Sequence, residues 1–224
     1  MTTQRTEIVT VSLFCGARTR LQNARRQISR AWLIARPLSP KTLSARNRRQ
    51  AEMLADYVCN GDRVLDVGCG RGYLCKHVEE IYGAVPTGLD VKDFRAAPIA
   101  FRCFDGTAIP FPDQSFDHVV LSFALHHSQD PMALIKECRR VARRGILIFE
   151  DLPESRFGRF VFNLHLVTFA QFYRVKTPRP TSTAYRSALA WLNTEAARVV
   201  QTPFKWPDPL YVPHFLVAYV LAGD

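Results

Sequence analysis

The 224-residue chain has no apolar run of the about 18–20 residues that a membrane-spanning helix requires, so a transmembrane class is excluded. Its six cysteines form no CxxC pair and no zinc-type spacing, and nothing at its start resembles a secretory signal. We therefore expect reduced thiols in a cytosol-like compartment, most of them buried as small apolar side chains. No internal repeat or low-complexity tract is visible.

Acidic residues are scarce near the start of the chain. Residues 1–50 hold eleven Lys and Arg against one acid, Glu7, whereas the remaining 174 residues hold 19 basic and 19 acidic groups. The net charge of +10 therefore belongs to an N-terminal arm, and the body is neutral. Between Arg18 and Ala35 apolar residues recur at helical spacing with arginines off the stripe, which predicts an amphipathic helix within a basic arm at 1–44.

From residue 45 onward, short apolar strands alternate with helices and turns. The expected strands are 63–67, 85–89, 99–104, 117–123, 145–149, 198–202 and 215–221. The expected helices are 45–58, 73–82, 131–142 and 185–197. Strands separated by helical segments predict an α/β fold with a doubly wound, parallel sheet that is covered on both faces.

The strand at 63–67 runs directly into a turn that contains Gly68, Gly70 and Gly72. Glycine allows a positive φ there and lets a ligand lie against bare backbone, at the strand end where doubly wound sheets bind ligands. The GxGxG spacing differs from the GxGxxG of dinucleotide sites. Asp66 would repel a pyrophosphate but attract the ammonium and sulfonium groups of S-adenosylmethionine, so the acid argues against NAD.

Two further acids follow the next two strands. Asp90 closes the strand at 85–89, and an acid there can accept hydrogen bonds from both ribose hydroxyls. NAD enzymes use the same device, so Asp90 alone does not discriminate between the two cofactors. Asp105 follows the third strand, where it can accept from the adenine amino group.

In order and spacing, these residues resemble the class I methyltransferases of the type 11 group, which includes the ubiquinone/menaquinone-biosynthesis methyltransferases. The segments that carry the resemblance are 64–72, 90, 105–106, 110–117 and 125–127. The resemblance covers about Ala45 to Asp151. It implies a methyltransferase domain at 45–224 with a seven-stranded, mostly parallel, Rossmann-like sheet and an antiparallel last strand.

The resemblance implies a site for S-adenosylmethionine that is spread over the glycine turn and the next three strand ends, with no metal. The predicted cofactor-binding residues are Asp66, Gly68, Cys69, Gly70, Gly72, Asp90, Val91, Asp105, Gly106 and Ser122. Asp66 and the glycines hold the methionine end, Asp90 the ribose, and the acid at 105 the adenine, while the serine lies near the methionine moiety. Turn geometry and helix capping alone also explain single glycines and acids at such positions.

Two histidines, His126 and His127, follow the fourth strand on the ligand side of the predicted sheet. Methyl transfer needs mainly alignment and a dry site, but a nucleophile can also need a base, and histidine titrates in the right range. His127 is therefore the candidate base. Alternatively, His127 packs or caps the helix that starts at 130–131, and His126 faces away. Glu150 and Asp151, at the end of the fifth strand, are further acid/base candidates.

Aromatic side chains crowd residues 155–173, where members of this family wall the substrate pocket. We expect a helical insert at 155–197 on the substrate side and a small, apolar or aromatic acceptor. A core helix that packs on the sheet explains the same aromatics equally well. The Asn-Pro-Pro-Tyr tetrapeptide typical of amino-group methylation is absent at 122–125, which favours oxygen or carbon acceptors.

Several functions for the basic arm stay open: a lid over the cofactor, a membrane-surface helix at 18–36, or an organellar presequence. Nucleic acid is disfavoured as a partner because the body carries no continuing basic stripe. We expect a cytoplasmic enzyme, with membrane association or organellar targeting through the arm as alternatives. Two other classes remain: a non-catalytic cofactor-binding or assembly module, and an RNA or protein methyltransferase recruited by the arm.

Overall fold

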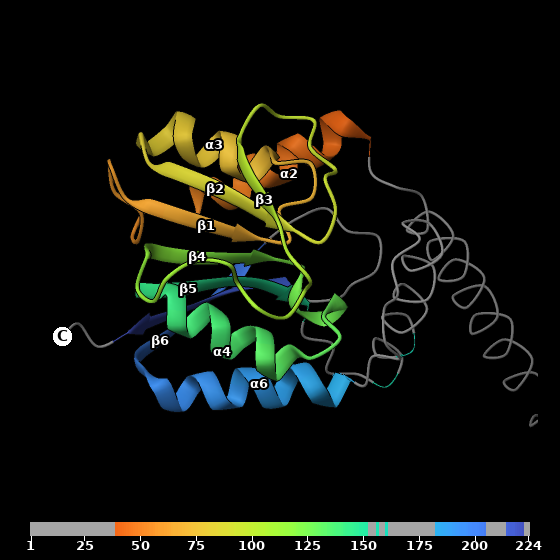
Figure 1. Cartoon of the computed structure of the whole chain (residues 1–224), viewed down its shortest axis with the longest axis vertical. Helices are drawn as coiled ribbons and strands as arrows, with labels where there is room; N and C mark the ends of the chain where they lie inside the picture. Colours follow the sequence, from red (N-terminus) through yellow and green to blue (C-terminus); the bar gives the residue numbers. More distant parts are fainter. Residues whose placement is uncertain (1–38, 152–155, 157–159, 161–181, 205–213, 222–224) are drawn as a thin grey trace, which may run out of the picture.

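A computed structural model describes residues 39–151, 182–204 and 214–221, together with residues 156 and 160. These residues form a seven-stranded sheet in the order β3-β2-β1-β4-β5-β7-β6 (Figure 1). The strands are β1 (Arg63–Val67), β2 (Val85–Asp90), β3 (Ala100–Cys103), β4 (Phe116–Ser122), β5 (Ala142–Asp151), β6 (Ala196–Phe204) and β7 (His214–Leu221). The helices are α2 (Pro40–Glu52), α3 (Tyr73–Tyr82), the 3-10 turn η1 (Leu125–His127), α4 (Pro131–Val141) and α6 (Ser182–Glu195).

The sheet is mostly parallel. Strands β1 to β5 pair in parallel, whereas β7 pairs antiparallel with both β5 and β6. The predicted seven-stranded α/β sheet with an antiparallel last strand is therefore confirmed. Parallel strands end at one edge, and the strand order reverses between β1 and β4, which is where doubly wound sheets bind ligands.

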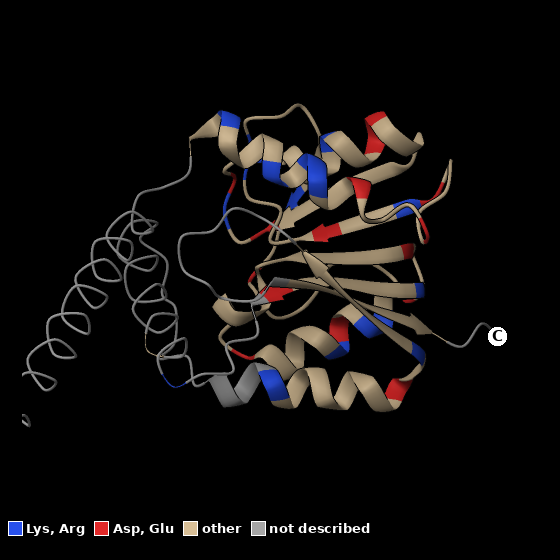
Figure 2. Cartoon of the chain, turned by 180° about the vertical axis from the view of Figure 1, so that it is seen from behind, with Lys and Arg blue, Asp and Glu red and all other residues tan. Residues whose placement is uncertain are grey.

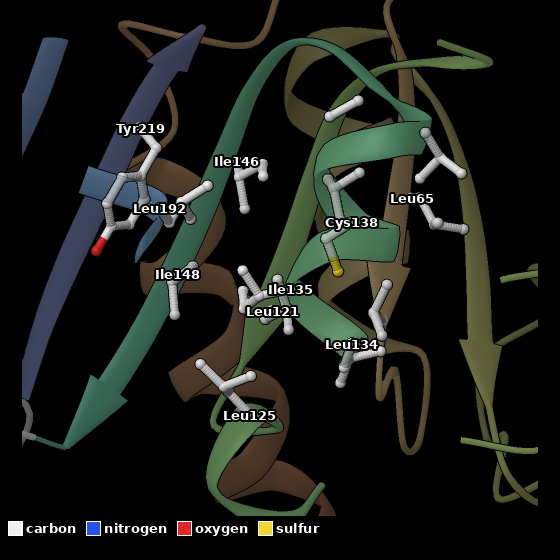
Figure 3. Packing of buried hydrophobic residues seen from close by; sticks show 14 of the residues in the cluster. Leu65, Leu121, Leu125, Leu134, Ile135, Cys138, Ile146, Ile148, Leu192 and Tyr219 are labelled. Atoms are coloured by element: carbon white, nitrogen blue, oxygen red, sulfur yellow. The ribbon is translucent and has the colours of Figure 1, made fainter. Parts of the chain in front are cut away.

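Side chains along the central strands alternate between two buried faces, as the two-residue period of a strand requires. On one face, the strand residues that pack with α4 and α6 include Leu65, Val67, Val119, Leu121, Ile146, Ile148, Val217 and Tyr219. On the other, those that pack with α2 and α3 are Val64, Val120, Leu147, Phe149, Leu216 and Ala218. Figure 3 shows the first cluster, in which Leu134, Ile135 and Cys138 of α4 are buried. Because both faces are covered, the strands are nearly continuous apolar runs.

Helix α2 differs from the predicted helix at 45–58 at both ends. It begins at Pro40, where the Ser39 hydroxyl accepts a hydrogen bond from the Thr42 N–H at 3.1 Å. Proline suits this first helical position because its missing N–H needs no partner there. The helix ends at Glu52, and the chain continues in turns to Val58. By contrast, α3 has the predicted bounds.

The loop before β4 is fastened to α4 by Arg140. The Arg140 guanidinium donates to the backbone oxygens of Ile109 and Phe111, each at 2.9 Å. Glu137 pairs with the same guanidinium and accepts from the Ile109 N–H at 2.8 Å. The part of the loop that leads into β4 is therefore held beside the edge of the sheet at which β4 and β5 begin.

Several predictions fall on residues outside the described ranges. They concern the arm helix at 18–35, the membrane contact at 18–36, and the aromatic segment at 155–173 of the proposed insert. The functions considered for the arm, and the cytoplasmic location, therefore stay predictions. In the part of the chain that the structure describes, no helix has both the length and the apolar character needed to cross a membrane.

Buried polar groups also lie near the opposite edge of the sheet, where the parallel strands begin. His118 and Asp62 are buried, and His118 Nε2 lies 3.6 Å from Asp62 Oδ2. Asp62 Oδ1 accepts a hydrogen bond from Arg144 at 2.8 Å. Burial lowers the pKa of His118 below its ordinary 6.5, although the Asp62 carboxylate opposes the shift. The fold therefore favours the neutral ring of His118.

This burial predicts a pH dependence of stability. Because the folded pKa of His118 lies below the unfolded value of 6.5, the neutral ring contributes stability above that pH, and the contribution is lost as the pH falls. His118→Leu should therefore lose less free energy of unfolding than the wild type between about pH 7.5 and about pH 5.5, as measured by urea denaturation. Equal losses in the two proteins would contradict the assignment.

Candidate functional site

The turn between β1 and α3 is built from backbone that only glycine adopts easily. Gly68 and Gly70 have φ values of +76° and +51°. The N–H groups of Gly68 and Cys69 reach the Leu89 oxygen at 2.7 and 3.2 Å, which ties the turn to β2. A Cβ on Gly68 would lie 2.5 Å from the Ala124 Cβ, whereas a Cβ on Gly70 would meet nothing within 4 Å. Gly68 thus allows the turn after β4 to approach, and Gly70 leaves bare backbone accessible.

Asp66 lies in β1 immediately before this turn and is only 2% exposed. Its Oδ2 accepts from the Cys75 thiol at 3.5 Å, while its Oδ1 has no hydrogen-bond partner among the described residues. Burial raises the pKa of Asp66 to about 7, and the negative charge of Asp90 acts in the same direction. A buried carboxylate with an unused oxygen is stabilised by a nearby cation.

Asp90 ends β2 beside the same turn. Its Oδ2 accepts from the Gly70 N–H at 2.9 Å and its Oδ1 from the Val91 N–H at 2.7 Å. Burial raises the pKa of Asp90, and the backbone hydrogen bonds act in the opposite direction. Val91 itself is 43% exposed at the strand end. The structure therefore brings together the glycine turn, Asp66 and the end of β2, as the sequence predicts.

The turn after β3 lies against the end of β2. Gly106 has a φ of +89°, and a Cβ there would lie 3.3 Å from a Val91 methyl group. Asp105 is exposed, and its Oδ1 accepts from the N–H groups of Thr107 and Ala108 at 2.8 and 2.9 Å. These hydrogen bonds hold the pKa of Asp105 below its ordinary value. Asp105 thus shapes the turn, and its contact with adenine stays a prediction.

Ser122, at the end of β4, contacts a residue that the sequence analysis did not single out. Its hydroxyl lies 3.0 Å from the amide nitrogen of Gln50, which is fully buried on α2. The sequence signal that could have identified it is a pair of polar residues, Asn47 and Gln50, which lie three apart on the same helical face as Ala51. Ser122 therefore lies at the predicted edge of the sheet, but with a partner from an N-terminal helix.

The two histidines differ in their surroundings. His126 is 3% exposed and its Nδ1 contacts the carboxylate of Glu150, which is fully buried at the end of β5. This contact holds His126 inside the fold. His127 is half-buried, and its ring centroid lies 4.2 Å from that of His126. The capping alternative for His127 is wrong, because Asp130 caps α4 through the Ala133 N–H at 2.9 Å.

Other acids lie at either edge of the sheet. Asp113 pairs with Arg140 in the loop before β4, and Asp117 pairs with Arg143 near the strand start. Asp113 therefore stabilises a turn, and Asp117 the flank of a strand. Asp151 ends β5, and its side chain lies outside the described part of the chain. Figure 2 marks the acidic positions of these strands in red.

Comparison with known proteins agrees with this geometry. Residues 65–149 match a family model described as a methyltransferase domain. Residues 65–149 therefore have the sequence pattern of a methyltransferase domain. The matched residues of the methyltransferase domain run from β1, beside Asp66, to Phe149 in β5.

Two relatives and one solved structure illustrate how far the similarity to this methyltransferase domain extends. A demethylmenaquinone methyltransferase of Thermotoga maritima is 28% identical over 137 residues, which cover 56% of this chain and 59% of that protein. A ubiquinone biosynthesis O-methyltransferase of Coxiella burnetii is 27% identical over 115 residues, 46% of this chain and 49% of that protein. A SAM dependent methyltransferase from Aquifex aeolicus has the same fold, with a TM-score of 0.54 and 18% identity over 78% of this chain and 89% of that one. The chain thus spans about half the length of the relatives that it matches.

The match to a methyltransferase domain supports S-adenosylmethionine as the cofactor. The residues of the site fit its chemistry. The unpartnered Oδ1 of buried Asp66 suits a cationic ligand, and the Gly70 backbone lies open beside it. A pyrophosphate at the same place would add negative charge next to two buried carboxylates, Asp66 and Asp90, and would be repelled.

Gly68 and Gly70 form a matched pair for a test of this turn. Gly68→Ala should lower the free energy of unfolding by about 2–5 kcal/mol, since left-handed strain adds to the contact with Ala124. Gly70→Ala should cost about 1–2 kcal/mol from strain alone, but weaken cofactor binding because its methyl group enters the open side of the turn. Urea denaturation and calorimetry with S-adenosylmethionine measure the two effects. Equal destabilisation by both substitutions would contradict this account.

Proposed function

We propose that the protein transfers a methyl group from S-adenosylmethionine to a small, apolar or aromatic acceptor at oxygen or carbon. The observation that carries the proposal is the buried carboxylate of Asp66, with one unpartnered oxygen, beside a turn of accessible backbone. This arrangement favours a ligand with positive charge over a nucleotide that carries only phosphates. The methyltransferase domain match supports the same reaction class.

In this proposal the cofactor site extends across three neighbouring strand ends. Asp66, with Gly68 and Gly70, binds the methionine end, because the carboxylate attracts the ammonium and sulfonium charges. Asp90 binds the ribose hydroxyls while its oxygens keep the two backbone hydrogen bonds. The turn at 105–106, which packs on Val91, holds the adenine.

When bound, the cofactor would supply a methyl group on cationic sulfur: an acceptor electron pair would form the new bond to the methyl carbon in line as the S–C bond breaks and its electron pair stays on sulfur. The protein's residues align the acceptor, exclude water and take up its proton. His127 is the proposed proton acceptor, because it is half-buried and lies directly after β4 at the cofactor edge. The buried contact with Glu150 restricts the ring of His126. His127 packs against that ring.

The proposed acceptor class rests on the relatives. The names of two of them specify demethylmenaquinone methylation and O-methylation in ubiquinone biosynthesis. These reactions use aromatic or quinone-like acceptors, which agrees with the aromatic composition of residues 155–173. A phenol or hydroquinone is therefore the first acceptor class to test.

The raised pKa of Asp66 predicts that cofactor binding releases a proton. Without ligand the carboxyl group is half-protonated at about pH 7, and a bound cation favours its ionised form. The affinity for S-adenosylmethionine should therefore fall about tenfold per pH unit below pH 7 and level off above it. Calorimetry in buffers of different ionisation heat measures both the affinity and the proton release.

Asp66→Asn tests the same group by substitution. It keeps the shape of the side chain but removes the charge, so binding should weaken at least about tenfold and lose its pH dependence. Glu79→Gln, which removes an exposed acid from α3, is the charge-matched control and should bind as the wild type does. A pH-independent affinity in the wild-type protein would refute the proposed contact with Asp66.

The base is tested by His127→Gln. Removing a proton acceptor should lower kcat for a hydroquinone probe by about 10²–10⁴-fold and leave the cofactor affinity unchanged. Glu150→Gln should lower kcat less, since this carboxylate acts through His126. The control is His118→Gln, at a buried histidine of β4 near the opposite edge of the sheet. If His127→Gln and the control variant have the same kcat, His127 is not the base.

A further inference from the structure

Helix α2 carries a buried polar cluster that the reaction scheme above does not use. Asn47 and Gln50 are 9% and 0% exposed. The Asn47 amide donates to Gln50 Oε1 at 2.6 Å, and the Gln50 amide donates to the Ser122 hydroxyl at 3.0 Å. The Ser122 hydroxyl also lies 3.2 Å from Gln50 Oε1. Burial of amides is costly unless they are hydrogen-bonded, so this network holds α2 and β4 in one relative position.

Two contacts with α3 fix α2 from the other side. The Tyr82 hydroxyl donates to the Ala51 backbone oxygen at 2.8 Å, and Ser44 Oγ lies 3.0 Å from His77 Nε2. These contacts lie on either side of Gln50 along the helix. Gln50 is therefore presented to β4 from a helix that is held at both ends.

The segment that α2 contacts is conformationally restricted. Phe123 follows Ser122 and has a φ of +54°, a left-handed conformation that is unfavourable for a residue with a Cβ. Its N–H donates to the Phe149 oxygen at 2.9 Å, and the Arg46 guanidinium lies 4.9 Å from its ring centroid. Arg46 and Gln50 lie one helical turn apart, so they contact two adjacent residues of the turn after β4.

This turn leads directly to the cofactor site. Ala124 follows Phe123 and occupies the space in which a side chain on Gly68 would lie, at 2.5 Å from the ideal Cβ position. If the turn after β4 shifted toward the glycine turn, it would displace that turn, and if it shifted away, the contact between them would be lost. In the proposed function the glycine turn holds the methionine end of the cofactor. The contacts form a continuous path from Gln50 through Ser122 to Gly68.

We propose that Gln50 is a positioning residue: through Ser122 it fixes the turn after β4 against the glycine turn, and so sets the place of the cofactor's methionine end. This inference rests on the proposed function, which assigns that end to the glycine turn. It gives α2 a part in cofactor binding, although the helix lies outside the segment matched by the methyltransferase domain.

A double-mutant cycle on Gln50 and Ser122 separates positioning from simple packing. Gln50→Met keeps the volume but removes the amide, and Ser122→Ala removes only the hydroxyl. Each should weaken S-adenosylmethionine binding about tenfold, and the double variant should be no weaker than either single one, because both remove the same contact. Arg48→Gln, on the exposed face of α2 where Arg48 pairs with Glu52, is the control and should bind normally.

The cycle is run in parallel with Gln50→Asn, which keeps an amide but withdraws it from Ser122, so the result does not depend on the folding of Gln50→Met. Thermal unfolding identifies the variants that are folded. Unchanged affinity in a folded Gln50 variant, or additive losses in the double variant, would overturn the inference. Failure of the wild-type protein to bind S-adenosylmethionine would instead reject the proposed function, so the two failures are distinguishable.

Discussion

The close approach of two turns at the carboxyl edge of the sheet is the constraint on which the rest of the site depends. The turn after β1 and the turn after β4 meet at Gly68 and Ala124, where there is no room for a further methyl group. This contact lies at the point where the strand order reverses. It brings the end of β1, which carries Asp66, next to the end of β4, which leads to the histidines of η1.

The electrostatics of the site follow from that geometry. Asp66 and Asp90 are buried near one another, and desolvation raises the pKa of both carboxyl groups. Two backbone N–H groups partly offset the desolvation of the Asp90 carboxylate, whereas Asp66 accepts a hydrogen bond only from a thiol. The ligand-free protein therefore carries an electrostatic cost at Asp66 that a cationic ligand relieves, and this relief favours one class of ligand over another.

Local patterns predicted most of the sheet and the cofactor edge. β1 and α3 have their expected bounds, because an apolar run, a glycine turn and a helical stripe are each signalled by adjacent residues. The predicted start of the helix at residue 45 is too late, because a proline can also occupy the first position of a helix, as Pro40 does in α2. The His126–Glu150 and Gln50–Ser122 contacts join residues 24 and 72 positions apart, and no local pattern specifies such pairs.

The position of β7 has a consequence for how the protein is made. β6 is joined to the sheet only through β7, which is inserted between β5 and β6 although it follows both in the chain. While the polypeptide emerges from the ribosome, β5 therefore has an open edge and β6 has no partner until residues 214–221 have been synthesised. Such late, non-local pairing is slow and exposes strand edges to intermolecular association. The edge of β5 thus stays open while β6 is synthesised, and only β7 covers it.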